Sequence, residues 1–215
     1  MRAKLISYTG WAFVLAAGLY FIYANAIHYF SYNLDSYGEG FFPAYAPSLL
    51  IHVSFGIIAL LLGPLQFRAA FRKKYPTIHR NMGKAYLVSI LIASMASLNL
   101  SINKMIITEH VTTFGTGLIG LAIAWISTSA MAFWAARSKN FVQHREWMVK
   151  SYVVTFAFVT FRLVEKLLLV GFDMKGLEVA NILAWSCWSI PLLVTEMILQ
   201  GQKINRGNAA RAGKA

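Results

Sequence analysis

Apolar residues occur in six long runs, separated by shorter connections that carry most of the charged residues. Each run is close to the roughly 20 residues that a helix needs to cross the hydrocarbon core of a bilayer. Lipid offers no partners to backbone amides, so only helices or closed barrels cross it, and runs this long are not barrel strands. The pattern predicts an all-α integral membrane bundle of six transmembrane helices, at roughly 9–29, 48–67, 84–102, 114–135, 150–171 and 179–199.

The composition supports a membrane protein with a single domain. Hydrophobic residues make up 58% of the chain, charged residues only 13%, and the mean hydropathy is +0.55. These values are typical of membrane proteins and exclude an ordinary soluble domain. The six runs fill residues 1–200, and the basic segment 201–215, rich in Gly and Ala, is predicted to be a flexible tail. The single cysteine, Cys187, lies within the last run, so no disulfide forms within the chain.

The first run has features of both a signal peptide and a retained helix. Arg2 and Lys4 precede its apolar part, and Ala24-Asn25-Ala26 near its end resembles a cleavage site. The apolar stretch is longer than that of most signal peptides. This length favours a first helix that is retained.

Basic residues are distributed asymmetrically between the connections. The formal net charge is +12, and most of the 20 lysines and arginines lie before the first run, between the second and third, between the fourth and fifth, or after the sixth. The acidic residues of the other connections are Asp35, Glu39, Glu109, Asp173 and Glu178. The positive-inside rule therefore places both termini in the cytoplasm. Basic loops beside a membrane contact anionic lipid headgroups, so the predicted partner is the bilayer and not nucleic acid.

Histidines accompany each of the second to fifth runs. His52 and His110 lie near the outer ends of their runs, and His79 and His144 near the inner ends. Two imidazoles from facing helices can hold a low-spin b-type haem, which transfers electrons. The arrangement predicts haem b as a cofactor with two histidine pairs, His52 with His110 and His79 with His144. His28, at the outer end of the first run, is a weaker candidate that could replace His110.

The residues beside the outer pair are small. On the helical face of His52 they are Gly56, Ala59 and Gly63, and His110 is followed at similar spacing by further glycines. A helix that holds a flat porphyrin closely needs small side chains beside the ligand. The alternative is equally physical, because small residues four apart also let membrane helices pack closely without a cofactor. Each histidine taken alone also fits a structural role.

Segment 143–169 combines a basic entry, an apolar run and three charged residues. Written as one helix, it carries a discontinuous polar stripe from His144 to Arg162 and Lys166. An ion in hydrocarbon costs several kcal/mol unless it is paired, so Arg162, Glu165 and Lys166 are predicted to face a protein interior. The alternative is an i,i+3 ion pair between Arg162 and Glu165, with Lys166 reaching to the surface. In a haem protein, Arg162 would neutralise a propionate or bind an anionic or quinone-like reductant.

Short motifs surround three of the histidines. They are His52 with Gly56 and Gly63-Pro64-Leu65-Gln66-Phe67, then His79-Arg80-Asn81-Met82-Gly83-Lys84-Ala85-Tyr86, then His144-Arg145-Glu146-Trp147-Met148 with Ser151-Tyr152. Over roughly residues 45–170 the chain resembles the predicted membrane proteins grouped as domain-of-unknown-function family 2306. The resemblance includes Arg162 and implies a bacterial multi-pass protein of the cytoplasmic membrane, without an assigned activity.

The plan of six helices with paired histidines is also similar, by architecture alone, to the ascorbate-dependent transmembrane b-type cytochromes. The leading hypothesis is a membrane electron-transfer protein that passes electrons between a small reductant or quinol and an acceptor. The alternative is a haem-free transporter, or an assembly or scaffold subunit. A hydrolase is disfavoured because the chain has neither a nucleophile elbow nor an HExxH motif. No catalytic residue and no oligomeric state are assigned.

Overall fold

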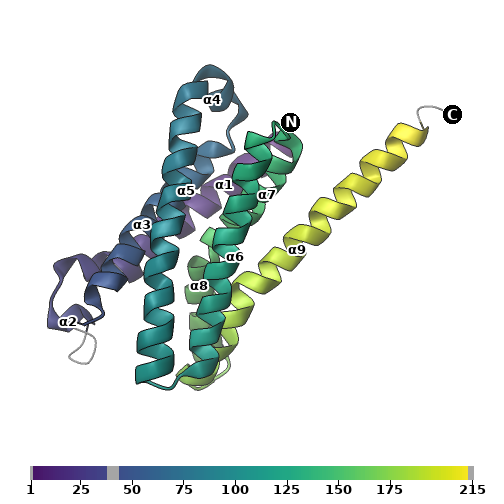
Figure 1. The fold of residues 1–215 in the computed structure, drawn as a ribbon. Coiled ribbons are helices and arrows are strands. Elements are labelled where there is room, and N and C mark those ends of the chain that lie inside the picture. Colours follow the sequence, from purple (N-terminus) through teal and green to yellow (C-terminus); the bar gives the residue numbers. More distant parts are fainter. Residues whose placement is uncertain (1, 38–43, 213–215) are drawn as a thin grey trace.

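Helices and short turns make up the described part of the chain, and no strand occurs among these residues (Figure 1). The computed structural model describes residues 2–37 and 44–212. The predicted all-α fold is confirmed. Glu39, one of the acidic residues expected on the outer side, lies outside the described residues.

The helices follow one another with short connections. The α-helices are α1 (Arg2–Phe21), α2 (Leu34–Tyr37), α3 (Ala46–Gln66), α4 (Ala69–Lys74), α5 (Pro76–Asn99), α6 (Thr112–Arg137), α7 (Phe141–Thr155), α8 (Ala157–Gly171) and α9 (Gly176–Ala212). The π-helices η1 (Ile22–Ala26) and η3 (Leu100–Thr108) continue α1 and α5, and the 3₁₀-helix η2 (Ile27–Ser31) follows η1. The segment 201–215, predicted to be a flexible tail, is helical as far as Ala212, where α9 ends.

Within the described chain, five helical stretches are long and apolar enough to cross a membrane. They are Thr9–Ser31, Ala46–Gln66, Pro76–Thr108, Thr112–Arg137 and Gly176–Arg206. The run at 150–171, expected to be a further span, is divided between α7 and α8, which have 15 residues each. In Figure 1, these two helices together lead from the end of α6 to the start of α9, at opposite ends of the bundle. The structure therefore supports a multi-pass bundle, and a sixth crossing by α7 and α8 stays a prediction.

The break between α7 and α8 lies at Phe156. Its ψ of −1° is far from the value of about −42° in a regular helix. Three β-branched residues, at 153–155, precede the break, and such residues fit a helix less well. The hydroxyl of Thr155 donates to the carbonyl oxygen of Ser151 at 2.9 Å, a type of bond that bends helices. The single continuous helix expected over 143–169 is wrong at this point.

The break changes the neighbours of the chain on its two sides. α7 packs against α6, α9 and α3, whereas α8 packs against α9 and α1. The two halves of the expected helix therefore have different surroundings, and α8 diverges from α6.

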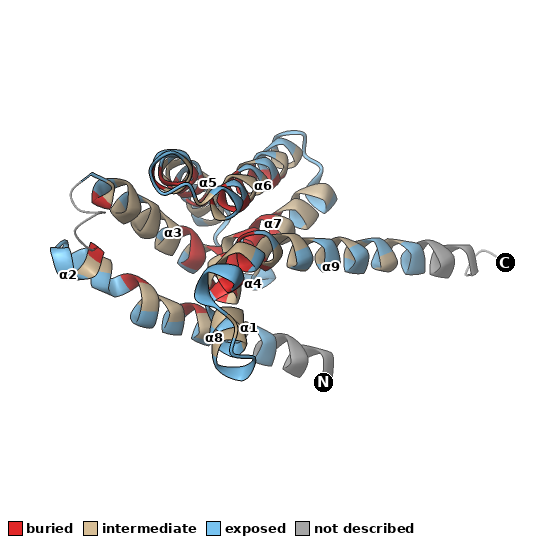
Figure 2. Ribbon diagram, turned by 90° about the horizontal axis from the view of Figure 1, so that it is seen from below, coloured by how far each residue is buried: buried red, intermediate tan, exposed pale blue. Residues whose placement is uncertain are grey.

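The core lies where α3, α5, α6 and α7 face one another. Buried positions concentrate on the facing sides of α5, α6 and α7 (Figure 2). Tyr86 of α5 is fully buried, and Tyr152 of α7 is nearly so. The ring of Tyr152 lies against Gly63 of α3, where an added Cβ would come within 2.2 Å of the ring. The Phe67 ring, with its centroid 5.8 Å from that of Tyr152, extends this packing to Trp11 of α1.

The basic segments gather at one end of the bundle. The start of α1, the helix α4, the turn from α6 to α7 and the end of α9 all lie at the upper end in Figure 1. α4 alone contributes Arg72, Lys73 and Lys74 to this end. The positive-inside rule predicts that this end faces the cytoplasm, and it is named the inner end below. The outer end carries η3 and the turn from α8 to α9.

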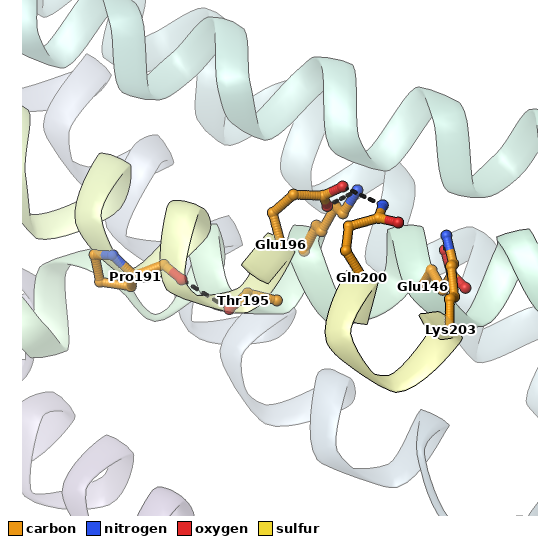
Figure 3. Close-up of polar contacts among 7 residues, drawn as sticks. Glu146, Pro191, Thr195, Glu196, Gln200 and Lys203 are labelled. Carbon is orange, nitrogen blue, oxygen red and sulfur yellow. Dashed lines mark hydrogen bonds and ion pairs between the residues drawn. The ribbon is translucent and has the colours of Figure 1, made fainter. Parts of the chain in front are cut away.

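Toward the inner end, α9 leans away sideways from the other helices (Figure 1). Two ion pairs join it to α7 (Figure 3): Lys150 with Glu196, and Lys203 Nζ with a Glu146 carboxylate oxygen at 2.7 Å. Gln200 Nε2 also donates to Glu196 at 2.6 Å. These contacts fix the direction in which α9 leaves the bundle.

Candidate functional site

A cavity lies at the point where α8 diverges from α6. It has a volume of about 310 Å³ and is bounded by α1, η1, η2, α3, α5, η3, α6, α7 and α8. Its walls are mainly apolar, and their polar side chains include Asn25, His52, Ser97, Thr155 and Arg162. An apolar cavity with a few polar groups is the usual form of a ligand or cofactor site.

His52 lines this cavity from α3. Its Nδ1 is 2.9 Å from the carbonyl oxygen of Ala93 on α5. A carbonyl oxygen only accepts, so Nδ1 carries the proton and Nε2 keeps its lone pair. No hydrogen-bond partner for Nε2 occurs among the described residues. The rings of Trp125 and Phe158 stand edge-on to the imidazole, with centroids at 6.4 and 6.3 Å, and fix its plane.

At the inner end, the structure places His79 and His144 near each other. His144 Nδ1 is 2.8 Å from the carbonyl oxygen of Ala132 on α6, so its tautomer is fixed in the same way as that of His52. His79 of α5 is close enough to His144 for their charges to interact. The Nδ1 atom of His79 is buried and has no hydrogen-bond partner within 2–37 and 44–212.

The outer histidines are not brought together in this way. His110 is exposed in the turn between η3 and α6, where its φ is 56°. It does not line the cavity that His52 lines. His28 of η2 is also exposed, and its ring lies against that of Tyr29 with centroids 4.0 Å apart. Tyr29 lines the cavity, whereas His28 does not.

Arg162 lies on the wall between the cavity and a second hollow. This hollow, of about 540 Å³, is formed by α1 and α8 and is also lined by Glu165 and Lys166. Arg162 Nη1 donates to Glu165 Oε2 at 2.6 Å, and 43% of the Arg162 side chain is exposed. The prediction that all three charges face a protein interior is wrong, because α8 turns away from α6 after Phe156. The alternative, an i,i+3 pair of Arg162 and Glu165, is confirmed.

A chain of hydrogen bonds leads from the cavity toward the inner end. Trp125 Nε1 donates to Thr155 Oγ1 at 2.8 Å. Thr155 Oγ1 is 2.9 Å from Tyr86 Oη, which is in turn 2.9 Å from Ser151 Oγ. Ser151 Oγ is 2.8 Å from Ser129 Oγ. Side chains of α5, α6 and α7 are thereby joined within the core.

Sequence reasoning missed much of this site. Tyr86 and Ser151 belong to the motifs that carry the family resemblance, but those motifs give no role for their hydroxyl groups. Trp125 carries no sequence signal, because a tryptophan inside an apolar run is equally typical of lipid contact. Met105, which also lines the cavity, has a thioether of the kind that ligates haem iron, but it lies at no recognisable spacing from a histidine.

The histidines were predicted to hold haem b. Two of them have the hydrogen bonds of a ligating imidazole, but no second histidine lines the cavity beside His52. A histidine that ligates a metal usually donates its other ring nitrogen to a carbonyl or carboxylate oxygen, as His52 and His144 do here. In the described part of the chain, no group of three or more His, Cys, Asp or Glu side chains could hold a metal ion by itself. A haem differs from a bare ion because it requires only axial ligands from the protein.

Comparison with known proteins assigns the chain to a family. Residues 49–199 match the family described as predicted membrane protein (DUF2306). The matched segment contains His52, His79, His144 and Arg162. No curated protein and no solved structure matches the chain. Because the match covers more than half of its length, the protein belongs to the DUF2306 family of predicted membrane proteins.

Proposed function

We propose that this protein binds b-type haem and transfers electrons within the bacterial cytoplasmic membrane. The observation that carries the proposal is the state of His52. Its Nδ1 is held by the Ala93 carbonyl oxygen, and its Nε2 has no partner in the described chain and borders an apolar cavity. An imidazole prepared in this way is a good axial ligand for haem iron.

The chain offers two positions for haem. At the outer position His52 supplies a ligand, and at the inner position His79 and His144 supply two. When bound, haem supplies a metal centre that accepts and donates single electrons. The protein orients the ligand rings through the carbonyl oxygens of Ala93 and Ala132.

Arg162 is the proposed contact for a partner molecule. Its guanidinium group borders both the cavity and the hollow between α1 and α8. A guanidinium binds carboxylates and related oxygen groups through paired hydrogen bonds. Arg162 therefore suits a haem propionate, a quinol headgroup or a small anionic reductant that approaches from the outer side.

The absorption spectrum tests this proposal. The protein is expressed with a supply of haem precursor, purified in detergent, and measured oxidised and after reduction with dithionite. We expect a Soret band that shifts on reduction. The matched control replaces His52, His79 and His144 by alanine and is checked for helical content by circular dichroism. A wild-type protein without a Soret band, or an equal band in the folded control, would reject haem binding.

The second candidate function is a haem-free membrane transporter, or an assembly or scaffold subunit. One observation favours a transporter: Arg162, paired with Glu165, lies on the wall shared by the hollow of about 540 Å³ and the cavity of about 310 Å³, where its guanidinium can bind a small anion. Uptake of a small anion into vesicles by protein with no haem spectrum would support this alternative. Co-purification of a stable partner complex would instead support the scaffold.

A further inference from the structure

The hydroxyl chain of Thr155, Tyr86, Ser151 and Ser129 has no role in the haem binding proposed above. Tyr86 and Ser151 are completely buried, and Ser129 is 4% exposed. A buried hydroxyl in a membrane helix is most simply satisfied by a carbonyl oxygen of its own helix. Thr128 of α6 does this, because its Oγ1 donates to the Ala124 oxygen at 2.7 Å. The neighbouring Ser129 bonds instead to Ser151 of another helix. Thr155 donates to the carbonyl oxygen of Ser151 in its own helix, and its oxygen accepts from Trp125 and can accept from Tyr86 as well.

We propose that this hydroxyl chain is a proton path between the inner end and the cavity. Each hydroxyl group can both donate and accept a hydrogen bond, so a proton can enter at one end while another leaves at the other. At each step one O–H bond breaks and the next one forms, and no group is oxidised or reduced. Trp125, whose indole N–H only donates, ends the chain beside the cavity at Thr155.

The same helical faces continue from the chain to the inner histidines. His79 lies two turns before Tyr86 on α5, and His144 lies two turns before Ser151 on α7. The helical faces that carry the hydroxyl chain therefore lead toward the inner end of the bundle.

Between His79 and Tyr86, α5 faces a polar side chain of α3. Gly83 lies on α5 between His79 and Tyr86. Gln66 of α3 faces this glycine, because a Cβ added there would be 3.7 Å from Gln66 Oε1. The Nε2 atom of Gln66 is buried and unpaired within the described residues, so the amide can hydrogen-bond to a group that crosses this turn.

Charged side chains line the outer end of the path. Thr155 and Arg162 line the same cavity, and Arg162 stands on the wall toward the outer hollow. Arg162 is paired with Glu165, and Lys166 lines the same hollow, so the three side chains together leave a positive charge on this wall. A positive charge repels protons and other cations in a narrow passage. The proposed path leads from the inner end to the cavity and is opposed at the outer end by the charge on this wall, so it would protonate a molecule in the cavity without leaking protons across the membrane.

Proton flux into vesicles tests the path. Haem-free protein is reconstituted into vesicles of phosphatidylcholine and phosphatidylglycerol that contain a pH-sensitive dye, and a potassium gradient with valinomycin supplies the driving force. We expect little flux with the wild type and a larger flux with Arg162→Gln. Adding Tyr86→Phe to Arg162→Gln should return the flux to that of protein-free vesicles.

The matched control is Tyr152→Phe in the same Arg162→Gln background. It removes another buried tyrosine hydroxyl, which donates to the Leu60 carbonyl oxygen at 3.2 Å and lies outside the chain. This control should keep the increased flux. If Tyr86→Phe fails to fold by circular dichroism, Ser151→Ala interrupts the next link and replaces it.

Two outcomes would overturn the path. One is an equal flux with and without the Tyr86 hydroxyl in the Arg162→Gln background. The other is no flux above protein-free vesicles in either the wild type or Arg162→Gln. Because the protein in this assay contains no haem, the result does not depend on the haem spectrum, and each proposal can fail by itself.

Discussion

The inner and outer halves of the bundle differ in how closely they pack around glycines on the same face of α3. Gly56 and Gly63 lie two turns apart on one face of α3, but only Gly63 meets a neighbour, the ring of Tyr152. A Cβ added at Gly56 would have nothing within 4 Å. The inner half is closely packed, whereas the outer half contains the cavity of about 310 Å³ that His52 lines.

This difference originates in the break at Phe156. Before the break, α7 lies against α6 and its Tyr152 fills the space beside α3. After the break, α8 packs against α9 and α1 but no longer follows α6, and the space beside α6 stays open. Glycines at helical spacing in the sequence therefore do not predict close packing by themselves. In one half of α3 a glycine allows a neighbouring ring to approach, and in the other half a glycine borders a cavity.

The sharpest contrast should come from the two outer histidines. Within the proposed function, His52→Ala removes the iron ligand of the cavity, so the outer share of the haem absorption is lost. His110→Ala should leave the spectrum unchanged, because His110 is exposed in a turn outside the cavity. Spectra of the two purified variants measure this difference. An equal loss of haem in both would mean that His110 is a ligand after all.

A methyl group at Gly63 should cause the largest loss of stability. Its Cβ would come within 2.2 Å of the Tyr152 ring, so the ring must shift. Overpacking of this kind costs about 2 kcal/mol. The free energy of unfolding of Gly63→Ala in mixed micelles, compared with wild type, tests the value. A neutral effect would show that the inner half is less closely packed than described.

The same change at Gly56 should have a small effect of opposite sign. No atom lies within 4 Å of the added Cβ, so no clash occurs. Alanine stabilises a helix relative to glycine by up to about 1 kcal/mol. Unfolding in the same micelles measures the gain. Destabilisation of Gly56→Ala as large as that of Gly63→Ala would remove the distinction between the two halves.

The smallest effect is expected at the edge of the inner half. Lys203→Ala removes the ion pair with Glu146 that joins α9 to α7 (Figure 3). The Lys203 side chain is 38% exposed, and pairs of this kind contribute about 0.5 kcal/mol or less. The melting temperature in detergent should fall only slightly. A large decrease would indicate that the direction of α9 supports the packed inner half.

The sequence predicted the fold class from periodicity alone. Runs of apolar residues near the length of a bilayer core require helices whatever the neighbours are, so the all-α membrane bundle and the gathering of basic segments at one end followed directly. The i,i+3 pair of Arg162 and Glu165 was predictable for the same reason, since it depends only on local helical geometry.

Contacts between distant residues could not be predicted in this way. His52 and His110 have similar positions near the outer ends of their apolar runs, but one lines a cavity and the other lies in an exposed turn with φ of 56°. A backbone turn of this kind has no signature in apolar periodicity. The hydroxyl chain was equally hidden, because it joins Tyr86 to Ser151 across 65 positions of the chain.

The amino-acid sequence by itself determined that this protein is a helical membrane bundle with a basic inner end, because hydrophobicity and charge act on each segment separately. Only the tertiary structure decided which polar side chains meet. The bend at Phe156 leaves the inner half of the bundle closely packed and the outer half with a cavity. Residues 151–155 favour the bend locally, but the neighbours on its two sides come from other parts of the chain, which no single segment contains.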